Sequence, residues 1–198
     1  MAQGGGRGWV RVIAGTWRGL RLATLSGLEV RPTSDRVRES LFGILGRRVE
    51  GAGVVDCFAG TGALGIEALS RGARWAQFVE QDPRALAILR ENVGRLREAP
   101  EVSIVRADAL RPREWAREAF PADLIFADPP YRRGLGESFL AALAGAGVLA
   151  PGGLVLIEHE HGILPAHEAW TAVDRRRYGE TAVTIYAPRD AAGDEGRA

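Results

Sequence analysis

Lysine is absent from this 198-residue chain, and all 26 basic residues are arginine. Cysteine occurs once, as Cys57, and no apolar run approaches the ~20 residues that a helix needs to cross a bilayer. One cysteine excludes a disulfide framework, and the short apolar runs exclude a helical membrane protein. The first residues are rich in glycine and arginine and lack the apolar core of a signal peptide, so we expect a soluble, cytoplasmic protein.

Positive charge is concentrated near the start of the chain. The first 48 residues hold nine arginines against three acids, a net +6, whereas the whole chain has a net charge of +1. Guanidinium groups suit phosphate contacts and base stacking, so we expect nucleic acid to bind this basic end. The length and the 46% of hydrophobic residues predict one domain with a full core.

Strand and helix patterns alternate along the rest of the chain. The expected strands are 54–57, 76–80, 102–106, 123–127, 154–158, 171–176 and 181–187. The expected helices are 62–71, 83–97, 111–118 and 137–146. This alternation predicts a parallel α/β sheet with helices on both faces. We expect this unit to occupy 49–188, after a basic extension at 9–48 and between flexible ends at 1–8 and 189–198.

The basic extension begins with a predicted β-hairpin. Alternating apolar runs at 9–14 and 20–24 flank a turn that contains two glycines. Arginines and a tryptophan lie together at and beside the turn, a combination typical of single-strand binding. The predicted RNA contacts of the hairpin are Arg11, Trp17, Arg18 and Arg21. A solvated hairpin that only covers the core is the alternative.

A helix is expected to follow, with its cap at 33–35 and an apolar face at helical spacing. Arg36 and Arg38 are expected on its solvent-exposed face. There they would bind phosphate or pair with Asp35 and Glu39. We include Arg36 among the predicted RNA contacts.

Residues Leu124–Tyr131 read LIFADPPY, an apolar strand that ends at a carboxylate, two prolines and an aromatic ring. The exocyclic amine of a nucleobase is a poor nucleophile, because its lone pair is delocalised into the ring. Asp128 can accept a hydrogen bond from such an amine, and the carbonyls around Pro129 and Pro130 are further acceptors on a stiff backbone. Tyr131 offers a face on which the base can stack. The motif predicts methylation of a base amine, with a strand stopped by Pro-Pro as the structural alternative.

A glycine-rich turn follows the first predicted strand of the α/β unit, in the sequence VVDCFAGTGALG at 54–65. Glycines at such a turn let the backbone approach a ligand closely. They also satisfy the G-x-G-x-x-G pattern of dinucleotide-binding folds, and Glu80 follows roughly 20 residues on. Asp56 favours a different ligand, because a carboxylate would face the pyrophosphate of a dinucleotide but suits the cationic ammonium of S-adenosylmethionine.

Acidic residues end or follow four of the predicted parallel strands, at Asp56, Glu80, Asp108 and Asp128. Ligands of parallel α/β sheets bind outside the carboxyl ends of the strands. We therefore expect the four carboxylates to share one edge of the sheet. Asp82, which precedes Pro83, is expected to cap a helix instead.

Other candidate groups carry weaker signals. Glu158-His159-Glu160-His161 would place both histidines on one face of a strand, but two histidines without a further clustered ligand make a weak zinc site, and we predict no metal. Cys57 lies within a strand pattern and is expected to be a buried, reduced thiol. Arg132 and Arg133 follow Tyr131 and are expected to contact substrate phosphates.

Three motifs together resemble one protein family: RPT with RVRE and LF at 31–42, DCFAGTG at 56–62 and DPPY at 128–131. From about Val10 to Tyr186 the chain is similar to the bacterial 16S ribosomal RNA guanine-N2 methyltransferases, the RsmD family. The resemblance implies a Rossmann-like, seven-stranded class I methyltransferase fold. In that fold the sheet is mostly parallel, the last strand is antiparallel, and a small hairpin and helix precede the domain.

The resemblance also implies S-adenosyl-L-methionine as cofactor and a specific guanine of 16S ribosomal RNA, within the small ribosomal subunit, as substrate. The implied cofactor-binding residues are Asp56, Phe58, Gly60, Gly62, Glu80, Asp108 and Ala109. The implied catalytic residues are Asp128, Pro129, Pro130 and Tyr131. Relatives can carry phenylalanine at the position of Tyr131, so its ring rather than its hydroxyl is expected to matter. The family suggests a monomer that acts on protein-bearing small subunits.

We expect an in-line displacement in which a flipped-out base presents its amine to the methyl carbon, so that positioning supplies most of the rate. Three alternatives remain open. A DNA, other RNA or free-nucleotide amino methyltransferase is disfavoured because the chain has no inserted target-recognition domain. A non-catalytic ribosome-assembly factor is the second, and it is disfavoured because such a protein would be free to lose Asp128, Asp56 and Gly60, which are all present here. A nicotinamide-dependent oxidoreductase is the third, and a cofactor-binding measurement would separate it from the others.

Overall fold

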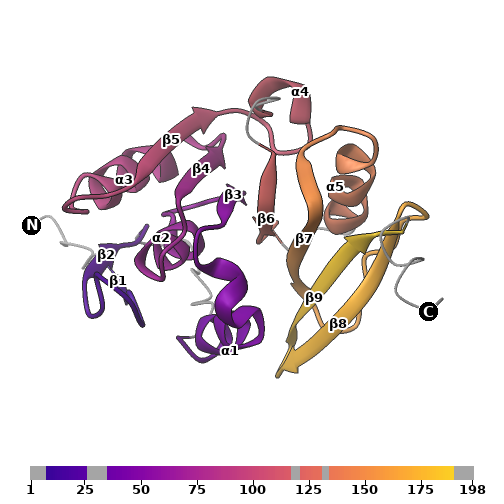
Figure 1. Cartoon of the computed structure of the whole chain (residues 1–198), viewed down its shortest axis with the longest axis horizontal. Coiled ribbons are helices and arrows are strands. Elements are labelled where there is room, and N and C mark those ends of the chain that lie inside the picture. Colours follow the sequence, from indigo (N-terminus) through magenta and orange to yellow (C-terminus); the bar gives the residue numbers. More distant parts are fainter. Residues whose placement is uncertain (1–7, 26–34, 117–120, 131–133, 190–198) are drawn as a thin grey trace, which may run out of the picture.

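The computed structural model describes residues 8–25, 35–116, 121–130 and 134–189. Its strands are β1 Trp9–Arg11, β2 Arg21–Ala23, β3 Gly53–Cys57, β4 Trp75–Glu80, β5 Glu101–Arg106, β6 Ala122–Ala127, β7 Leu149–Glu160, β8 Trp170–Tyr178 and β9 Thr181–Pro188. Its helices are α1 Asp35–Leu45, the 3-10 helix η1 Gly46–Val49, α2 Ala63–Ser70, α3 Pro83–Val93, α4 Pro112–Trp115 and α5 Leu135–Leu143. Figure 1 shows the hairpin β1-β2 on one side and β8 and β9 on the other. No helix in the described ranges is long and apolar enough to span a membrane.

The main sheet has seven strands in the order β5-β4-β3-β6-β7-β9-β8. Neighbours from β5 to β7 pair in parallel, whereas β9 pairs antiparallel with both β7 and β8. This confirms the predicted Rossmann-like sheet and its antiparallel last strand. The chain moves outward from β3 to β5 and then returns to place β6 on the other side of β3. An α/β sheet binds ligands at such a switch point, outside the carboxyl ends of its strands.

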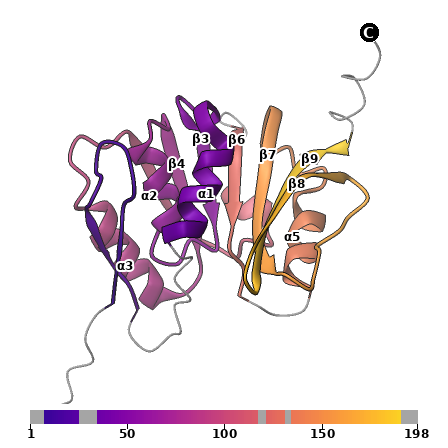
Figure 2. The same ribbon diagram turned by 90° about the horizontal axis from the view of Figure 1, so that it is seen from below.

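Two hydrophobic clusters cover the two faces of the sheet, because successive strand residues point to opposite sides. Phe126 and Leu156 pack with α1, α2, α3 and the hairpin on one face. Ile125 and Ile157 pack with α4 and α5 on the other face. Leu22 of the hairpin is fully buried in the first cluster, so the hairpin shares the core of the main sheet. Figure 2 shows the hairpin beside α3 on that face.

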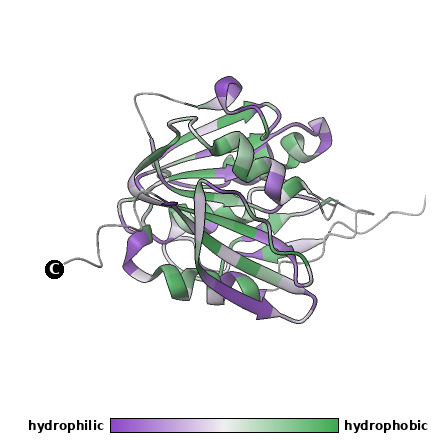
Figure 3. Cartoon of the chain, turned by 90° about the vertical axis from the view of Figure 1, so that its right-hand side faces the viewer, coloured by the Kyte–Doolittle hydropathy of each residue, from purple (hydrophilic) through white to green (hydrophobic). Residues whose placement is uncertain are grey.

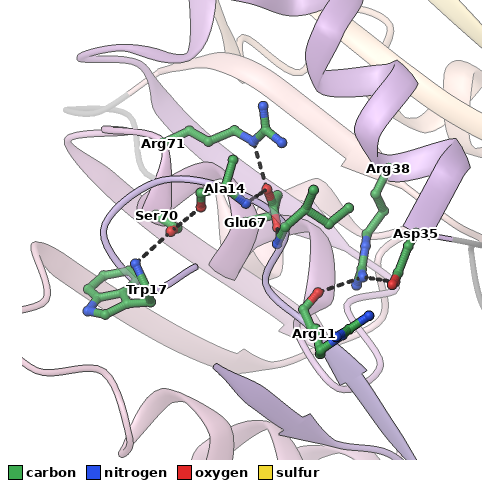
Figure 4. A network of polar contacts seen from close by, with 9 residues as sticks. Arg11, Ala14, Trp17, Asp35, Arg38, Glu67, Ser70 and Arg71 are labelled. Atoms are coloured by element: carbon green, nitrogen blue, oxygen red, sulfur yellow. Dashed lines mark hydrogen bonds and ion pairs between the residues drawn. The ribbon is translucent and has the colours of Figure 1, made fainter. Parts of the chain in front are cut away.

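A buried carboxylate of α2 holds the hairpin in place (Figure 4). Glu67 accepts hydrogen bonds from the N–H groups of Ile13 at 2.7 Å and Ala14 at 3.1 Å, and it pairs with Arg71 at 2.7 Å. Its exposed fraction is 0%. A buried charge needs such partners, because an unpaired one would carry a large desolvation cost. The hairpin therefore supplies part of what stabilises Glu67.

Asn92 of α3 joins the hairpin to the glycine-rich turn. Its side chain accepts a hydrogen bond from the N–H of Ala23 at 2.8 Å. It donates to the carbonyl oxygens of Ala23 at 3.0 Å and of Thr61 at 2.9 Å. Asn92 is fully buried, so one carboxamide connects β2 with the turn that follows β3, away from water.

Arg38 of α1 is buried, which corrects the expectation that it lies on the solvent face of the helix. It is 1% exposed, and its Nη2 donates to the carbonyl oxygen of Arg11 at 2.8 Å and to Asp35 at 2.7 Å. Burial lowers the pKa of the Arg38 guanidinium, while the charges of Asp35 and Glu67 oppose that shift. Arg38 lies one turn before Leu41 and Phe42, on the buried face of α1, and the hairpin covers it there. Arg36 is exposed, as expected.

Two element boundaries differ from the predicted ones by four or more residues. Helix α3 ends at Val93 rather than at 97, with Gly94 as its C-cap, and β7 begins at Leu149 rather than at 154. Asp82 caps α3 as predicted, because its side chain accepts from two main-chain N–H groups of the first turn. Cys57 is a buried free thiol, and burial raises its pKa.

Candidate active site

The carboxyl ends of β5, β4, β3 and β6 lie side by side, because these four neighbouring strands are parallel. Asp56 is the last residue but one of β3, and Glu80 ends β4. Asp108 and Asp128 come within two residues of the ends of β5 and β6. The four predicted acids therefore belong to one edge of the sheet, at the switch point between β3 and β6.

Asp56 is enclosed by the protein rather than open to solvent. It is 1% exposed, and its Oδ2 accepts a hydrogen bond from the N–H of Gly65 at 2.8 Å. Burial, with a smaller contribution from the charge of Glu80, raises the pKa of the Asp56 carboxyl to about 8 against the effect of that hydrogen bond. Asp56 thus holds the first turn of α2 against β3. The predicted contact with a cofactor ammonium stays a prediction.

The turn between β3 and α2 has a backbone conformation that requires glycine. Gly60 has φ +55° and Gly62 has φ +85°, in the left-handed region. A Cβ on Gly62 would also lie 2.4 Å from Cδ1 of Leu89. Phe58 has φ +55° without being glycine, a strained conformation that clusters at functional sites. Its ring meets that of Phe139 edge-on, with 5.6 Å between centroids.

Glu80 ties the glycine-rich turn to the end of β4. Its Oε2 accepts from the N–H of Gly60 at 2.8 Å, and its Oε1 accepts from the next two N–H groups of the chain. Asp108 accepts from the N–H two residues on, at 3.0 Å, and Ala109 is buried beside it. A carboxylate has about four lone-pair sites, so both acids keep capacity to accept from a ligand.

A pocket of about 280 Å³ lies beside the end of β6. Pro129 and Pro130 line it, together with the first residues of α5 and the last residues of β7. Three of the lining residues, Glu137, Glu158 and Glu160, are acidic. The volume is just below the roughly 300–1,000 Å³ of typical small-molecule sites, which suits a single planar group.

The sequence analysis considered Glu158 and Glu160 only as part of a metal-binding pattern and did not single out Glu137. A signal for Glu158 was available. Ala127 of β6 is paired with Ile157 of β7, so Glu158 lies at the same level as Asp128. The same strand-end logic that selected the other acids therefore also selects Glu158.

His159 is engaged on both ring nitrogens. Its Nε2 lies 2.7 Å from Oγ1 of Thr184, and its Nδ1 lies 2.9 Å from the carbonyl oxygen of Glu160. A carbonyl only accepts, so Nδ1 carries the proton and Nε2 accepts from the threonine hydroxyl. Burial lowers the pKa of His159. Across the described part of the chain, no group of three or more potential metal ligands is present.

The turn of the hairpin lies far from the pocket. The main-chain N–H of Trp17 donates to Oγ of Ser70 at 3.0 Å, and its indole Nε1 donates to the carbonyl oxygen of Arg97 at 3.2 Å. Ser70 is the last residue of α2, which starts at the carboxyl edge of the sheet. The helix runs back to the amino edge, because Gly72 and Arg74, just after it, form main-chain hydrogen bonds with Gly51 and Ala52, just before β3. Trp17 also packs against the core. Trp17 and Arg18 therefore lie at the amino edge of the sheet.

The remaining predicted RNA contacts divide into two groups. Arg11, Arg18, Arg21 and Arg36 are exposed. The second group lies outside the described residues and consists of Arg132 and Arg133, together with the proposed stacking residue Tyr131. The segment 31–34 and the two predicted flexible ends, apart from Gly8 and Arg189, also lie outside them. Direct RNA contact by any of these side chains stays a prediction.

Comparison with known proteins gives a consistent picture. A family model described as Conserved hypothetical protein 95 matches residues 10–187. Ribosomal RNA small subunit methyltransferase D of Escherichia coli is 37% identical over 191 residues, which cover 96% of this chain and 94% of that protein. Putative rRNA methyltransferase YlbH of Bacillus subtilis is 34% identical, over 91% of this chain and 100% of that protein.

Two solved structures share the fold at similar identity. The structure described as putative methyltransferase yhhF from Escherichia coli has a TM-score of 0.79 and 36% identity, and the match covers 91% of this chain and 98% of that one. A putative methylase from Haemophilus influenzae has a TM-score of 0.74 and 31% identity, covering 90% and 98%.

Proposed function

Because the chain belongs to the Conserved hypothetical protein 95 family, that of ribosomal RNA small subunit methyltransferase D, we propose that it methylates the N2 amine of a guanine in 16S ribosomal RNA. The proposed donor is S-adenosyl-L-methionine, and the proposed target is a guanine of the guanine 966 type. The observation that carries the proposal is the pocket lined by Pro129 and Pro130, directly after Asp128, between the end of β6, the start of α5 and the end of β7. The proposal includes action in the cytoplasm, as a monomer, on the small ribosomal subunit.

The strand-end residues fit S-adenosyl-L-methionine in their chemistry. When bound, this cofactor supplies a methyl group activated by its sulfonium. Glu80 and Asp108 keep acceptor capacity, which suits the hydroxyl and amine donors of a nucleoside. Gly60 and Gly62 leave the backbone of the turn open to close approach. Phe58 and Ala109 would add apolar contact at the same edge.

Asp56 has a positioning role in this proposal. Its carboxyl group is enclosed and holds the N–H of Gly65, so it fixes the start of α2 relative to β3. The glycine-rich turn lies between these two elements. Asp56 therefore acts on the cofactor through the shape of the turn. The Asp56→Asn variant also tests whether the carboxylate contacts the cofactor ammonium.

Asp128 is proposed to act directly on the target amine. The side chain follows β6 at the carboxyl edge, where it can accept a hydrogen bond from N2 and orient its lone pair. Transfer would form the bond from N2 to the methyl carbon and break the bond of that carbon to sulfur, with a neutral thioether as leaving group. N2 would then be cationic, and the carboxylate of Asp128 would stabilise that charge and receive a proton from N2. The main-chain carbonyls around Pro129 and Pro130 are second acceptors for the same amine.

The acidic lining of the pocket supports guanine rather than adenine. The Watson–Crick edge of guanine presents two neighbouring donors, the N1–H and the N2 amine, whereas adenine presents an amine beside an acceptor nitrogen. Carboxylates only accept when ionised, so Glu137, Glu158 and Glu160 suit the guanine edge. Tyr131 is proposed to stack on the base.

The deciding experiment follows labelled methyl from S-adenosyl-L-methionine into small ribosomal subunits, naked 16S RNA and duplex DNA in parallel, with the modified nucleoside identified by mass spectrometry. N2-methylguanosine from subunits is the expected product. Methyladenine from DNA would keep the chemistry but replace the substrate, and absence of transfer despite cofactor binding would indicate an assembly factor. Binding of a nicotinamide nucleotide instead would indicate an oxidoreductase.

Substitution of the catalytic carboxylate gives the matching control. Asp128→Asn keeps the size of the side chain but removes its charge and half of its acceptor capacity, so transfer should fall at least a hundredfold. Cofactor affinity, measured by calorimetry, should change little. Loss of both together would mean that Asp128 is a structural residue.

A further inference from the structure

Strand β8 brings three consecutive arginines to the active-site edge of the sheet. Although β8 is the outermost strand, it runs in the same direction as β7, because β9 lies antiparallel between them. Arg176 is paired with Val183 across β8 and β9, and Val183 is paired with Glu158 of β7. Glu158 lines the pocket. The arginines therefore lie level with the pocket, about 10 Å from β7 at roughly 4.8 Å per strand spacing.

The arginines of β8 retain positive charge toward solvent. Arg175 donates to the carbonyl oxygen of His161 at 2.6 Å, and Arg177 donates to that of Gly179 at 3.0 Å. Carbonyl groups are neutral acceptors, so these contacts orient the two guanidinium groups without neutralising them. Arg176 pairs with Asp174 at 2.9 Å. Figure 3 faces this side of the molecule and shows hydrophilic stretches on the strands in front.

Helix α1 lies beside the end of β8 on one face of the sheet. The hydroxyl groups of Ser40 and Tyr178 are hydrogen-bonded, which fixes α1 beside the end of β8. Arg36 lies four residues before Ser40 and so on the same side of the helix, about 5–6 Å away between Cβ atoms. Arg36 is exposed. Tyr178 points to the face of the sheet that α1 covers, so Arg36 lies on that face. Arg175 and Arg177 point to the opposite face, the one from which His159 lines the pocket.

We propose that Arg175 and Arg177 bind phosphates of the RNA strand that flanks the target base. The inference rests on the proposed function, since it assumes an RNA substrate with its base in the pocket. The site is the rim of the pocket, and the ligand is the sugar-phosphate backbone. Arginine suits this contact because its planar, permanently charged group matches phosphate geometry.

A protective role is the competing explanation for the same arginines. Charged side chains on an edge strand prevent it from pairing with other strands, and β8 is such a strand. The two explanations differ in their consequences for salt. Phosphate contacts displace counterions and steepen the salt dependence of RNA binding, whereas edge protection leaves that dependence unchanged.

The test compares Arg175→Ala/Arg177→Ala with the unsubstituted protein and with a control that removes two exposed arginines elsewhere, Arg90→Ala/Arg113→Ala. Binding to small subunits is measured over a series of salt concentrations, together with KM and kcat for methyl transfer. The slope of log affinity against log salt should become shallower by about 1.4, at about 0.7 for each single-strand phosphate contact. The KM for subunits should rise at least tenfold, with kcat and cofactor affinity unchanged.

Further variants separate the possible outcomes. Arg175→Lys/Arg177→Lys keeps both charges and should recover most of the slope, and thermal unfolding confirms that β8 remains folded. Slopes that match the unsubstituted protein, or an equal change in the control, would overturn the inference alone. Absence of methyl transfer to any RNA by the unsubstituted protein would overturn the proposed function and this inference with it.

Discussion

The hairpin β1-β2 and the end of β8 both carry arginines, yet the molecule uses the two regions differently. The hairpin is tied down by buried polar groups, with Glu67 and Asn92 both fully buried beneath it. The β8 arginines are exposed, and their hydrogen bonds and ion pairs within the described ranges are with carbonyl groups and a neighbouring acid. The turn of the hairpin lies at the amino edge of the sheet, whereas the end of β8 lies at the carboxyl edge. A high content of arginine therefore does not identify the edge of the sheet that carries the candidate active site, whereas the direction of the strands does.

The difference leads to separate measurements for the two regions. Changes beneath the hairpin should appear in stability and in its dependence on pH, because the groups there are buried and paired within the protein. Changes on β8 should appear in the salt dependence of substrate binding, because its arginines face solvent.

Glu67→Ala should cause the largest effect. The substitution removes the acceptor of two hairpin N–H groups and leaves the partly buried Arg71 guanidinium without its partner. Breaking a buried pair in this way typically costs about 3–5 kcal/mol of the free energy of unfolding. Urea unfolding measures the loss, and hydrogen exchange should show faster exchange at 8–25. Glu67→Gln keeps an acceptor and should lose less; an alanine variant as stable as the unsubstituted protein would contradict the anchoring role.

Asn92→Ala should have the next largest effect. It removes three hydrogen bonds with main-chain groups of Ala23 and Thr61, at a net cost of about 1 kcal/mol each. Cofactor affinity should fall as well, because Thr61 belongs to the glycine-rich turn. Arg90→Ala, an exposed change on the same helix, is the control. Reduced stability with unchanged cofactor affinity would show that the turn does not depend on this connection.

Asp56→Asn should change how stability depends on pH. The pKa of Asp56 is raised from 3.8 to about 8, so the folded protein retains a proton that the unfolded chain releases. The stabilisation linked to that proton is complete below pH 3.8 and is lost as pH rises to about 8. The free energy of unfolding of the unsubstituted protein should therefore fall relative to that of the asparagine variant as pH rises between those limits. If the melting temperatures of the two proteins changed with pH in the same way across that range, the raised pKa of Asp56 would be contradicted. A large loss of cofactor affinity in the asparagine variant would support the ammonium contact.

Trp17→Phe should have the smallest effect. It removes one exposed hydrogen bond from the indole to Arg97, which is typically worth about 1 kcal/mol or less, and it keeps an aromatic ring against the core. RNA affinity should not change, because the hairpin turn lies away from the pocket. A several-fold loss of RNA affinity without loss of stability would restore the predicted stacking role and break the comparison with β8.

The succession of strands and helices along the chain and the row of acids were predictable because their signals are local. Each strand pattern, the glycine-rich turn and the DPPY motif occupy short stretches, and alternation with helices determines that the strands run in parallel. The start of β7 was missed because Pro151, Gly152 and Gly153 interrupt the strand pattern. The structure continues the strand through them with Gly152 at φ +75°.

The partners of Arg38 and Trp17 could not be predicted from their own neighbourhoods. Helical spacing puts Arg38 beside Leu41 and Phe42 on the buried face of α1, but the carbonyl that accepts its hydrogen bond belongs to Arg11, 27 residues earlier in the chain. Trp17 reaches a carbonyl 80 residues away. Such contacts depend on how separate elements pack, and no local pattern encodes them. The position of the β8 arginines beside the pocket likewise follows from strand pairing rather than from their sequence.

The reactivity of Cys57 toward thiol reagents can report on local opening of the central strand β3. It is the single cysteine of the chain and is fully buried in β3, next to Asp56. Thiol reagents attack the exposed thiolate, so labelling of the folded protein requires β3 to open. The labelling rate therefore measures that opening without any introduced probe. Its slowing by a bound nucleoside would convert directly into the free energy by which the ligand keeps the strand closed.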